Sequence, residues 1–137
     1  MKRDGFTILE MLAVIAILGI LLGIGIPSYL RWQQSQLLTQ AQTLIATELS
    51  SARTKAKRAN AAQEVTWTAS TFNGKKLDRV TISTSPQTLT YQQPYGTLRE
   101  DSAGNLPELT LTLNLGSRTA AVYVGGVFGK ATRGPLN

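Results

Sequence analysis

Residues Met11 to Leu30 form a run of 20 amino acids without a single charged side chain. A helix rises about 1.5 Å per residue, so about 20 residues cross the ~30 Å hydrocarbon core of a bilayer. The run therefore predicts one membrane-spanning helix. It leaves about a hundred residues for the rest of the chain, which is the size of one small domain.

Glu10 is the one charged residue between Phe6 and Leu30. A carboxylate at the bilayer centre costs about 2.5 to 3.5 kcal/mol on insertion scales. This acid therefore needs either a charged partner or a position at the headgroup level, where water can solvate it.

Two ordinary explanations of the amino terminus are incomplete. A secretory signal peptide also has a basic start and an apolar centre, but it ends in small residues of the A-x-A type. Here the run ends in GIPSYLRWQQSQ. A signal anchor oriented by cytoplasmic Lys2 and Arg3 explains the span but leaves Glu10 unexplained.

A third explanation is a family resemblance. The segment GFTILEMLAVIAILGILLGIGIPSYLRWQQSQ resembles the class III leader and first helix of type IV pilins and type II secretion pseudopilins. The matching residues are Gly5, Phe6, Thr7, Glu10 and the triplet Pro27-Ser28-Tyr29. The resemblance implies that prepilin peptidase cleaves after Gly5 and methylates the new terminus at Phe6. It also implies that Glu10 pairs with the terminal amine of a neighbouring subunit, and a buried charge is tolerable when it is paired.

The apolar pattern continues beyond Leu30 at steps of three and four residues, which is typical of an amphipathic helix. The recurring positions are Leu37, Leu38, Ala41, Leu44, Ile45, Leu49, Ala52 and Ala56. We expect one helix from about Thr7 to about Ala59, about 80 Å long, with a stop at Asn60. Pro27 favours a kink, and Gly19-x-x-x-Gly23 fits either close helix packing or flexibility. The expected divisions are a cleaved leader at 1–5, a membrane and filament-core half-helix at 6–30, an amphipathic half-helix at 31–60 and a head at 61–137.

After Asn60 the apolar period changes from about 3.6 to two, which predicts strands. The clearest is ELTLTLNL, in which Leu109, Leu111, Leu113 and Leu115 face one way and polar residues the other. The other expected strands are QEVTWTA, DRVTISTS, TLTYQ, RTAAVYVGG and VFGKATR. A long helix packed on a small antiparallel β-sheet is an α+β architecture, and it matches the pilin fold that the resemblance implies.

Within that family, the head is most similar to the H-type minor pseudopilins of type II secretion and to the FimT-like minor pilins. The similarity rests on ARTKAKRAN at the expected helix end and on YVGGVFGKATRG near the carboxy terminus. The chain has no cysteine, whereas many major pilins carry a cysteine pair, and this favours a minor role.

Basic residues are the candidates for nucleic-acid binding. The net charge is +6, and the stretch from Leu109 onward contains three basic residues and no acid. The candidates are Arg53, Lys55, Lys57 and Arg58 at the helix end and Arg118, Lys130 and Arg133 in the head. One explanation is that cations at a helix end interact with the helix dipole and with solvent. The other is a patch that contacts the phosphates of DNA, as the resemblance to FimT-like pilins implies.

The composition argues against catalysis. The chain has no histidine and no cysteine, which removes the commonest general base, thiolate nucleophiles and the commonest metal ligands. REDSAGNLPE contains Glu100, Asp101, Asn105 and Glu108, but its spacing fits a solvated turn better than a calcium loop. No catalytic residue, cofactor or metal site is predicted. Four aromatic residues are expected to pack in the sheet rather than to stack on bases: Trp67, Tyr91, Tyr95 and Tyr123.

The sequence therefore predicts a minor pseudopilin or minor pilin, held in the bacterial inner membrane by a single span with its head in the periplasm. Its expected partners are other pilin or pseudopilin subunits, prepilin peptidase and the membrane. The main alternative is a minor pilin that binds DNA during uptake. A membrane-anchored enzyme is a third class, which the missing histidine opposes.

Overall fold

The computed structural model describes residues 7–85, 88–100 and 104–137, and these contain one long helix and nine strands. In chain order the elements are α1 (Ile8–Ala59), β1 (Gln63–Thr66), β2 (Thr71–Phe72), β3 (Lys75–Lys76), β4 (Thr81–Ile82), β5 (Thr88–Gln92), β6 (Thr97–Leu98), β7 (Leu109–Leu115), β8 (Arg118–Gly125) and β9 (Lys130–Leu136). A helix packed on antiparallel sheets confirms the predicted α+β class. By their internal contacts, residues divide into two compact units, Met1–Gln33 and Gln34–Asn137.

In the first unit, Thr7 caps the start of α1. Its hydroxyl and carbonyl oxygens accept hydrogen bonds from the backbone N–H of Glu10 at 3.3 and 3.1 Å. A threonine at this position satisfies backbone donors that the first helical turn leaves unpaired. The helix is unbroken at Pro27, where the missing N–H removes one hydrogen bond, to the carbonyl of Gly23.

The apolar side chains of this unit are exposed on every side of α1. Exposed fractions run from 47% at Val14 to 82% at Ile8. Among the described residues, α1 is the helix that is long and apolar enough to cross a membrane. A helix that is apolar all round needs lipid or other helices around it.

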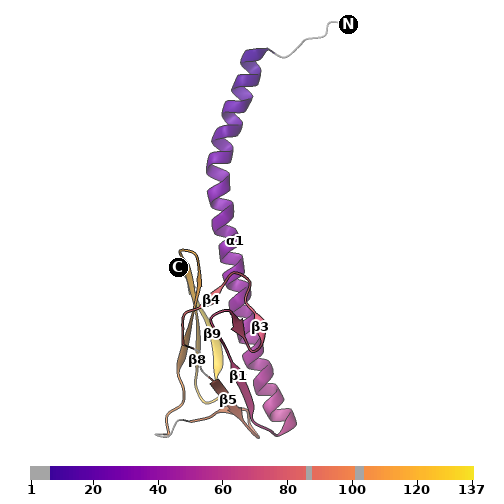
Figure 1. The fold of residues 1–137 in the computed structure, drawn as a ribbon, viewed down its shortest axis with the longest axis vertical. Coiled ribbons are helices and arrows are strands. Elements are labelled where there is room, and N and C mark those ends of the chain that lie inside the picture. The colour runs from indigo at the N-terminus through magenta and orange to yellow at the C-terminus, as the bar shows by residue number, and fades with distance from the viewer. Residues whose placement is uncertain (1–6, 86–87, 101–103) are drawn as a thin grey trace. The chain divides into compact units, whose positions relative to one another are not determined.

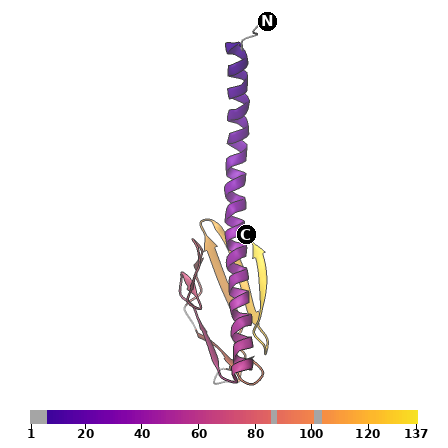
Figure 2. The same ribbon diagram turned by 90° about the vertical axis from the view of Figure 1, so that its right-hand side faces the viewer.

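In the second unit, the strands form two main antiparallel sheets. One has the order β4-β7-β8-β9, the other has the order β1-β5-β6, and β2 and β3 form a separate hairpin. Figure 1 and Figure 2 show the part of α1 from Gln34 onward lying along these strands. Its last residue is followed by Asn60 at φ +47°, a left-handed conformation that ends helices, which confirms the predicted stop.

One stripe of α1 supplies the helical half of the core. Leu38, Ile45 and Leu49 on that stripe are at most 2% exposed. The strands supply the rest, chiefly Val65, Phe72, Tyr91, Leu111, Leu113, Val122 and Val124. On β7 the leucines predicted to share one face are buried or half-buried, as the period of two requires.

The strands differ from the predictions mainly in length. TLTYQ is β5 as predicted, whereas DRVTISTS forms strand only at Thr81–Ile82. The last strand begins at Lys130 rather than Val127, because residues 126–129 form a turn closed by a hydrogen bond from the Gly129 N–H to the Gly126 carbonyl. The two-residue strands β2, β3 and β6 were not predicted.

Candidate functional site

Glu10 lies in the first turn of α1 and is exposed. It is the one charged residue on the described part of the helix as far as Leu30, and apolar side chains surround it. A carboxylate in the first turn also interacts favourably with the positive end of the helix dipole. Gly5 and Phe6, the predicted processing residues, lie outside the described residues, and Pro27 lies within α1.

Arg53 is held at the far end of α1 by two neighbours. Its Cζ atom lies 4.5 Å from the centre of the Phe128 ring, which is a cation–π arrangement. A side chain on Gly96 would come within 2.8 Å of the Arg53 Cγ and 3.0 Å of the Lys57 Cγ, so the Gly96 backbone packs directly on this helix end. Arg53 therefore belongs partly to the packing of the head, while Lys57 and Arg58 are exposed.

Lys130 and Arg133 lie on opposite faces of the sheet. Residues alternate faces along a strand, and directly opposed residues of neighbouring strands share a face. Arg133 lies opposite Val122, which is buried against the core, whereas Lys130 lies opposite Gly125, three positions away on β8. The two cations that were grouped as one predicted patch are thus separated by the strand itself.

The remaining predicted cations are also dispersed. Arg118 stands at the other end of β8 from Gly125, where its guanidinium donates a hydrogen bond to the hydroxyl of Ser35 on α1. Lys55 acts on Glu48, whose pKa its charge helps to lower. The structure brings Arg53 and Lys57 together at Gly96, and it brings Arg53 and Lys130 to one cavity of about 210 Å³. Arg118 lies in neither group.

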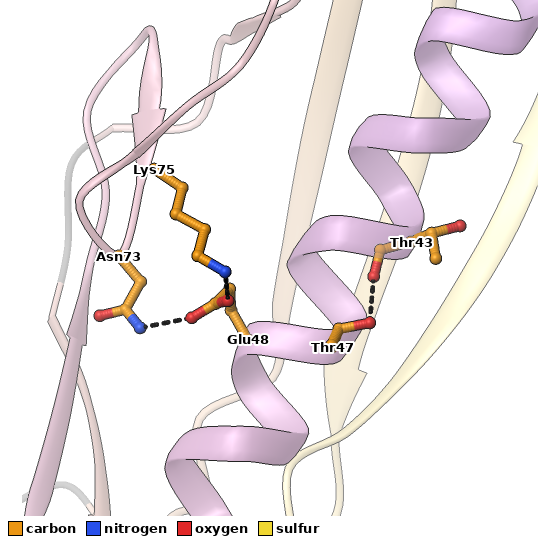
Figure 3. A network of polar contacts seen from close by, with 5 residues as sticks. All are labelled: Thr43, Thr47, Glu48, Asn73 and Lys75. Atoms are coloured by element: carbon orange, nitrogen blue, oxygen red, sulfur yellow. Dashed lines mark hydrogen bonds and ion pairs between the residues drawn. The ribbon is translucent and has the colours of Figure 1, made fainter.

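Glu48 is a site that the sequence analysis missed. The residue is 8% exposed. Its carboxylate accepts a hydrogen bond from Asn73 Nδ2 at 2.9 Å and lies 2.5 Å from Lys75 Nζ (Figure 3). The hydrogen bond from Lys75, followed by that from Asn73, holds the pKa of Glu48 below its usual value. The contact ties the β2–β3 hairpin to α1.

Gln42 is the second buried polar residue of α1 that was missed. Its side-chain amide donates to the carbonyl oxygens of Ala121 at 2.8 Å and Gly134 at 3.2 Å. These carbonyls lie where the pairing of β8 and β9 shifts register between Ala120 and Val122. Gln42 therefore supplies hydrogen bonds at an irregularity where the strand ladder is interrupted.

The four aromatic residues divide into two pairs. Trp67 and Tyr91 are buried as predicted, and the Tyr91 hydroxyl donates to the Gly129 carbonyl at 3.1 Å. Burial raises the pKa of Tyr91 to about 12. Tyr95 and Tyr123 are 69% and 45% exposed, so neither is a core residue. Tyr123 packs across strands, where it lies opposite Thr110 and Thr132.

Comparison with known proteins adds one finding. Residues 1–26 match the model of the prokaryotic N-terminal methylation motif. This match, together with the long apolar helix, supports a type IV pilin-like protein. No curated protein and no solved structure matched the chain.

Proposed function

We propose that this protein is a structural subunit, a minor pseudopilin or minor pilin, of a type II secretion or type IV pilus filament. Prepilin peptidase cleaves it after Gly5 and methylates Phe6. Before assembly the subunit is anchored in the inner membrane with its head in the periplasm. It then joins the filament by packing α1 against the helices of other subunits. Its function is mechanical, because a filament that grows by adding subunits moves cargo.

The observation that carries this proposal is a methylation motif on a helix whose apolar side chains are exposed on every side. The motif covers residues 1–26, and the apolar side chains from Ile8 to Leu30 are exposed. Apart from the helix's own nearby backbone, a Cβ atom added to Gly19, Gly23 or Gly25 would meet no heavy atom within 4 Å. Small residues allow the backbones of neighbouring helices to approach closely, so this surface suits a bundle of copies.

Glu10 gives the bundle its register. Cleavage creates an α-amine with a reference pKa of about 7.7 to 8.0, which is largely protonated at neutral pH. In an apolar bundle a carboxylate and an ammonium stabilise each other only when they meet, and either one alone is costly. A subunit that is shifted along the filament axis therefore leaves the Glu10 carboxylate and the terminal amine unpaired.

The test uses Glu10→Gln, with Glu64→Gln, an exposed acid of β1, as the matched control. Because the chain has no cysteine, one cysteine introduced at Leu18 reports contact between helices by crosslinking. We expect Glu10→Gln to be cleaved and methylated normally but to lose most of the crosslinked dimer, while Glu64→Gln keeps it. Mass spectrometry that finds a mature terminus other than Phe6, or an unchanged yield of crosslinked dimer in Glu10→Gln, contradicts the proposal.

A second candidate is a minor pilin that binds DNA, and the basic balance of the head supports it. Beyond Leu109 the chain carries Arg118, Lys130 and Arg133 and no acid. Binding through phosphates is insensitive to sequence and weakens steeply with salt. The test is retention of duplex DNA by Lys130→Ala and Arg133→Ala, singly and together. Because these residues lie on opposite faces, a single flat DNA contact predicts a loss from one of the two variants, and unchanged retention in the double variant rejects this function.

A further inference from the structure

The uncharged part of α1 ends at a pair of aromatic residues. Tyr29 and Trp32 lie three positions apart on the helix, and their ring centroids are 5.9 Å apart at an interplanar angle of 35°. Residues at this spacing are neighbours on one face of a helix. The two side chains are 59% and 57% exposed, so the described part of the chain leaves this aromatic surface open.

The chemistry of the helix changes at the same place. The run from Met11 to Leu30 is uncharged, whereas Arg31 is charged and the residues after Trp32 are the polar sequence QQSQ. Tryptophan and tyrosine are enriched where the hydrocarbon core of a membrane meets water, because each has an apolar ring with one polar group. The pair therefore lies where the boundary between lipid and water is expected.

The length of α1 agrees with this position. From Glu10 to Tyr29 the helix rises about 29 Å, at about 1.5 Å per residue. The hydrocarbon core of a bilayer is about 30 Å thick. An upright helix thus places Glu10 near one headgroup layer and the aromatic pair in the other, with only uncharged residues between them.

We propose that the Tyr29–Trp32 pair binds the headgroup layer of a phospholipid bilayer and fixes the outer boundary of the membrane span before the subunit joins a filament. The rings pack against the upper acyl chains, and the phenol hydroxyl and indole N–H form hydrogen bonds with water and lipid ester oxygens. The charge of Arg31 at the same level opposes movement of this segment into the hydrocarbon core. The inference rests on the membrane anchoring in the proposed function and adds the residues and the depth of the lipid contact.

The chain's two tryptophans allow the depth to be measured. Trp32 is exposed on α1, whereas Trp67 is buried in the head. The full chain is placed in phosphatidylcholine vesicles whose acyl chains carry bromine, a quencher of tryptophan fluorescence, either next to the headgroup or near the chain end. The difference in quenching between the protein and Trp32→Phe belongs to Trp32. We expect the bromine next to the headgroup to quench Trp32 more strongly, and neither lipid to quench the Trp67 that remains in Trp32→Phe.

The matched control is Ile20→Trp in the Trp32→Phe background, because Ile20 is 65% exposed near the middle of the span. Its tryptophan should be quenched in the opposite order, most strongly by bromine near the chain end. If neither introduced nor natural tryptophan of α1 is quenched, the proposed membrane span is wrong and this inference falls with it. If Ile20→Trp behaves as expected but Trp32 is unquenched, or is quenched most from the chain end, this inference alone is overturned, because water, protein or the bilayer centre then surrounds the pair.

A second measurement tests whether the pair holds the span in place. The chain has no cysteine, so Ile26→Cys provides a single thiol about one turn before the pair. A maleimide that cannot cross membranes, added on the side of the head, should label this thiol slowly. Tyr29→Ala with Trp32→Ala should speed the labelling about tenfold, because a factor of ten requires only about 1.4 kcal/mol. Removing two aromatic rings from an apolar phase loses more than that.

The control for this labelling removes two large apolar side chains at the same spacing from the middle of the span. Ile15→Ala with Leu18→Ala keeps both aromatic rings and should leave the labelling of Ile26→Cys unchanged. Equal labelling rates in the two alanine variants overturn the anchoring role. All of these positions lie outside the second compact unit, so an unchanged melting temperature of the head should accompany every variant.

Discussion

Lys75 on the β2–β3 hairpin places its ammonium 2.5 Å from the carboxylate of Glu48 on α1. The hairpin has only two residues in each strand. A two-stranded hairpin is marginally stable by itself. A bridge between Phe72 and Trp67 and a hydrogen bond from the Asn73 N–H to the Thr66 carbonyl at 2.7 Å join it to the end of β1, and buried Phe72 and the Glu48 contact join it to the helix side of the core.

Glu48→Gln should destabilise the head by about 1 to 2 kcal/mol, because an amide cannot accept two charge-assisted hydrogen bonds as well as a carboxylate. Most of the loss should come from the Asn73 hydrogen bond and the covered carboxylate, since Lys75 is 60% exposed and solvent weakens its charge. Thermal unfolding at neutral pH measures the change. The exposed acid replacement Glu64→Gln should leave the melting temperature within error.

The Glu48 contact also makes the stability of the head depend on pH, and this stability should fall as the solution becomes acidic. The pKa of Glu48 is lower in the folded protein than its ordinary value of 4.5, so the folded state favours the ionised form. Its contribution to stability is present above pH 4.5 and is lost as the pH falls through the folded pKa. The difference in melting temperature between the protein and Glu48→Gln should therefore shrink steadily below that pH. A difference that persists unchanged in strong acid would show that the charge is not its cause.

At alkaline pH, the ionisation of Tyr91 should lower the stability of the head. Burial raises its pKa from 10.0 to about 12, so the folded state favours the neutral phenol. Its contribution is complete below pH 10 and is lost as the pH rises towards 12. Ultraviolet difference absorbance should show a tyrosine ionisation step near pH 12. Tyr91→Phe should remove that late step, and its persistence would assign the step to another tyrosine.

Gln42→Leu should cost about 1 to 3 kcal/mol, because it leaves the carbonyl oxygens of Ala121 and Gly134 without their buried donor. In the Gln42→Leu variant, hydrogen exchange should show that β9 opens faster than β7. Gln40→Leu, one exposed position on the same helix, is the control. Equal protection of β9 in both variants would mean that the strand irregularity does not depend on Gln42.

Gly129→Ala should destabilise more than Gly126→Ala. Both glycines have positive φ, so both substitutions strain the backbone. Only at Gly129 would the new Cβ also come within 2.9 Å of Leu98 and of the Tyr91 hydroxyl. Chemical denaturation measures the free energy of unfolding of each variant. The difference between the two variants separates the steric cost at Gly129 from the backbone strain that both share. An equal loss of stability in the two variants would show that the turn moves away from β6.

The elements predicted correctly from the sequence are those in which a periodic apolar pattern repeats over many residues. The uncharged run and the continuing stripe to Ala56 define α1, and the alternation in ELTLTLNL defines β7, because each repeats one period several times. Strands of two residues, such as β3, contain no period to detect. Gln42 and Glu48 could have been noticed as polar residues on an otherwise apolar stripe, but their partners are residues 25 to 92 positions away in sequence. The separation of Lys130 from Arg133 follows from their odd spacing on one strand, so the predicted strand VFGKATR already implied it.

β9 is the last strand of its sheet, with β8 on one side and no further strand on the other among the described residues. An unprotected outer strand is a template on which copies can join by extending the sheet into aggregates. Here that strand carries Lys130, Arg133 and Pro135, two repelling cations and a residue without an N–H, and its register shift distorts the end near Gly134. These features oppose edge-to-edge pairing of β9 with a second copy of the chain.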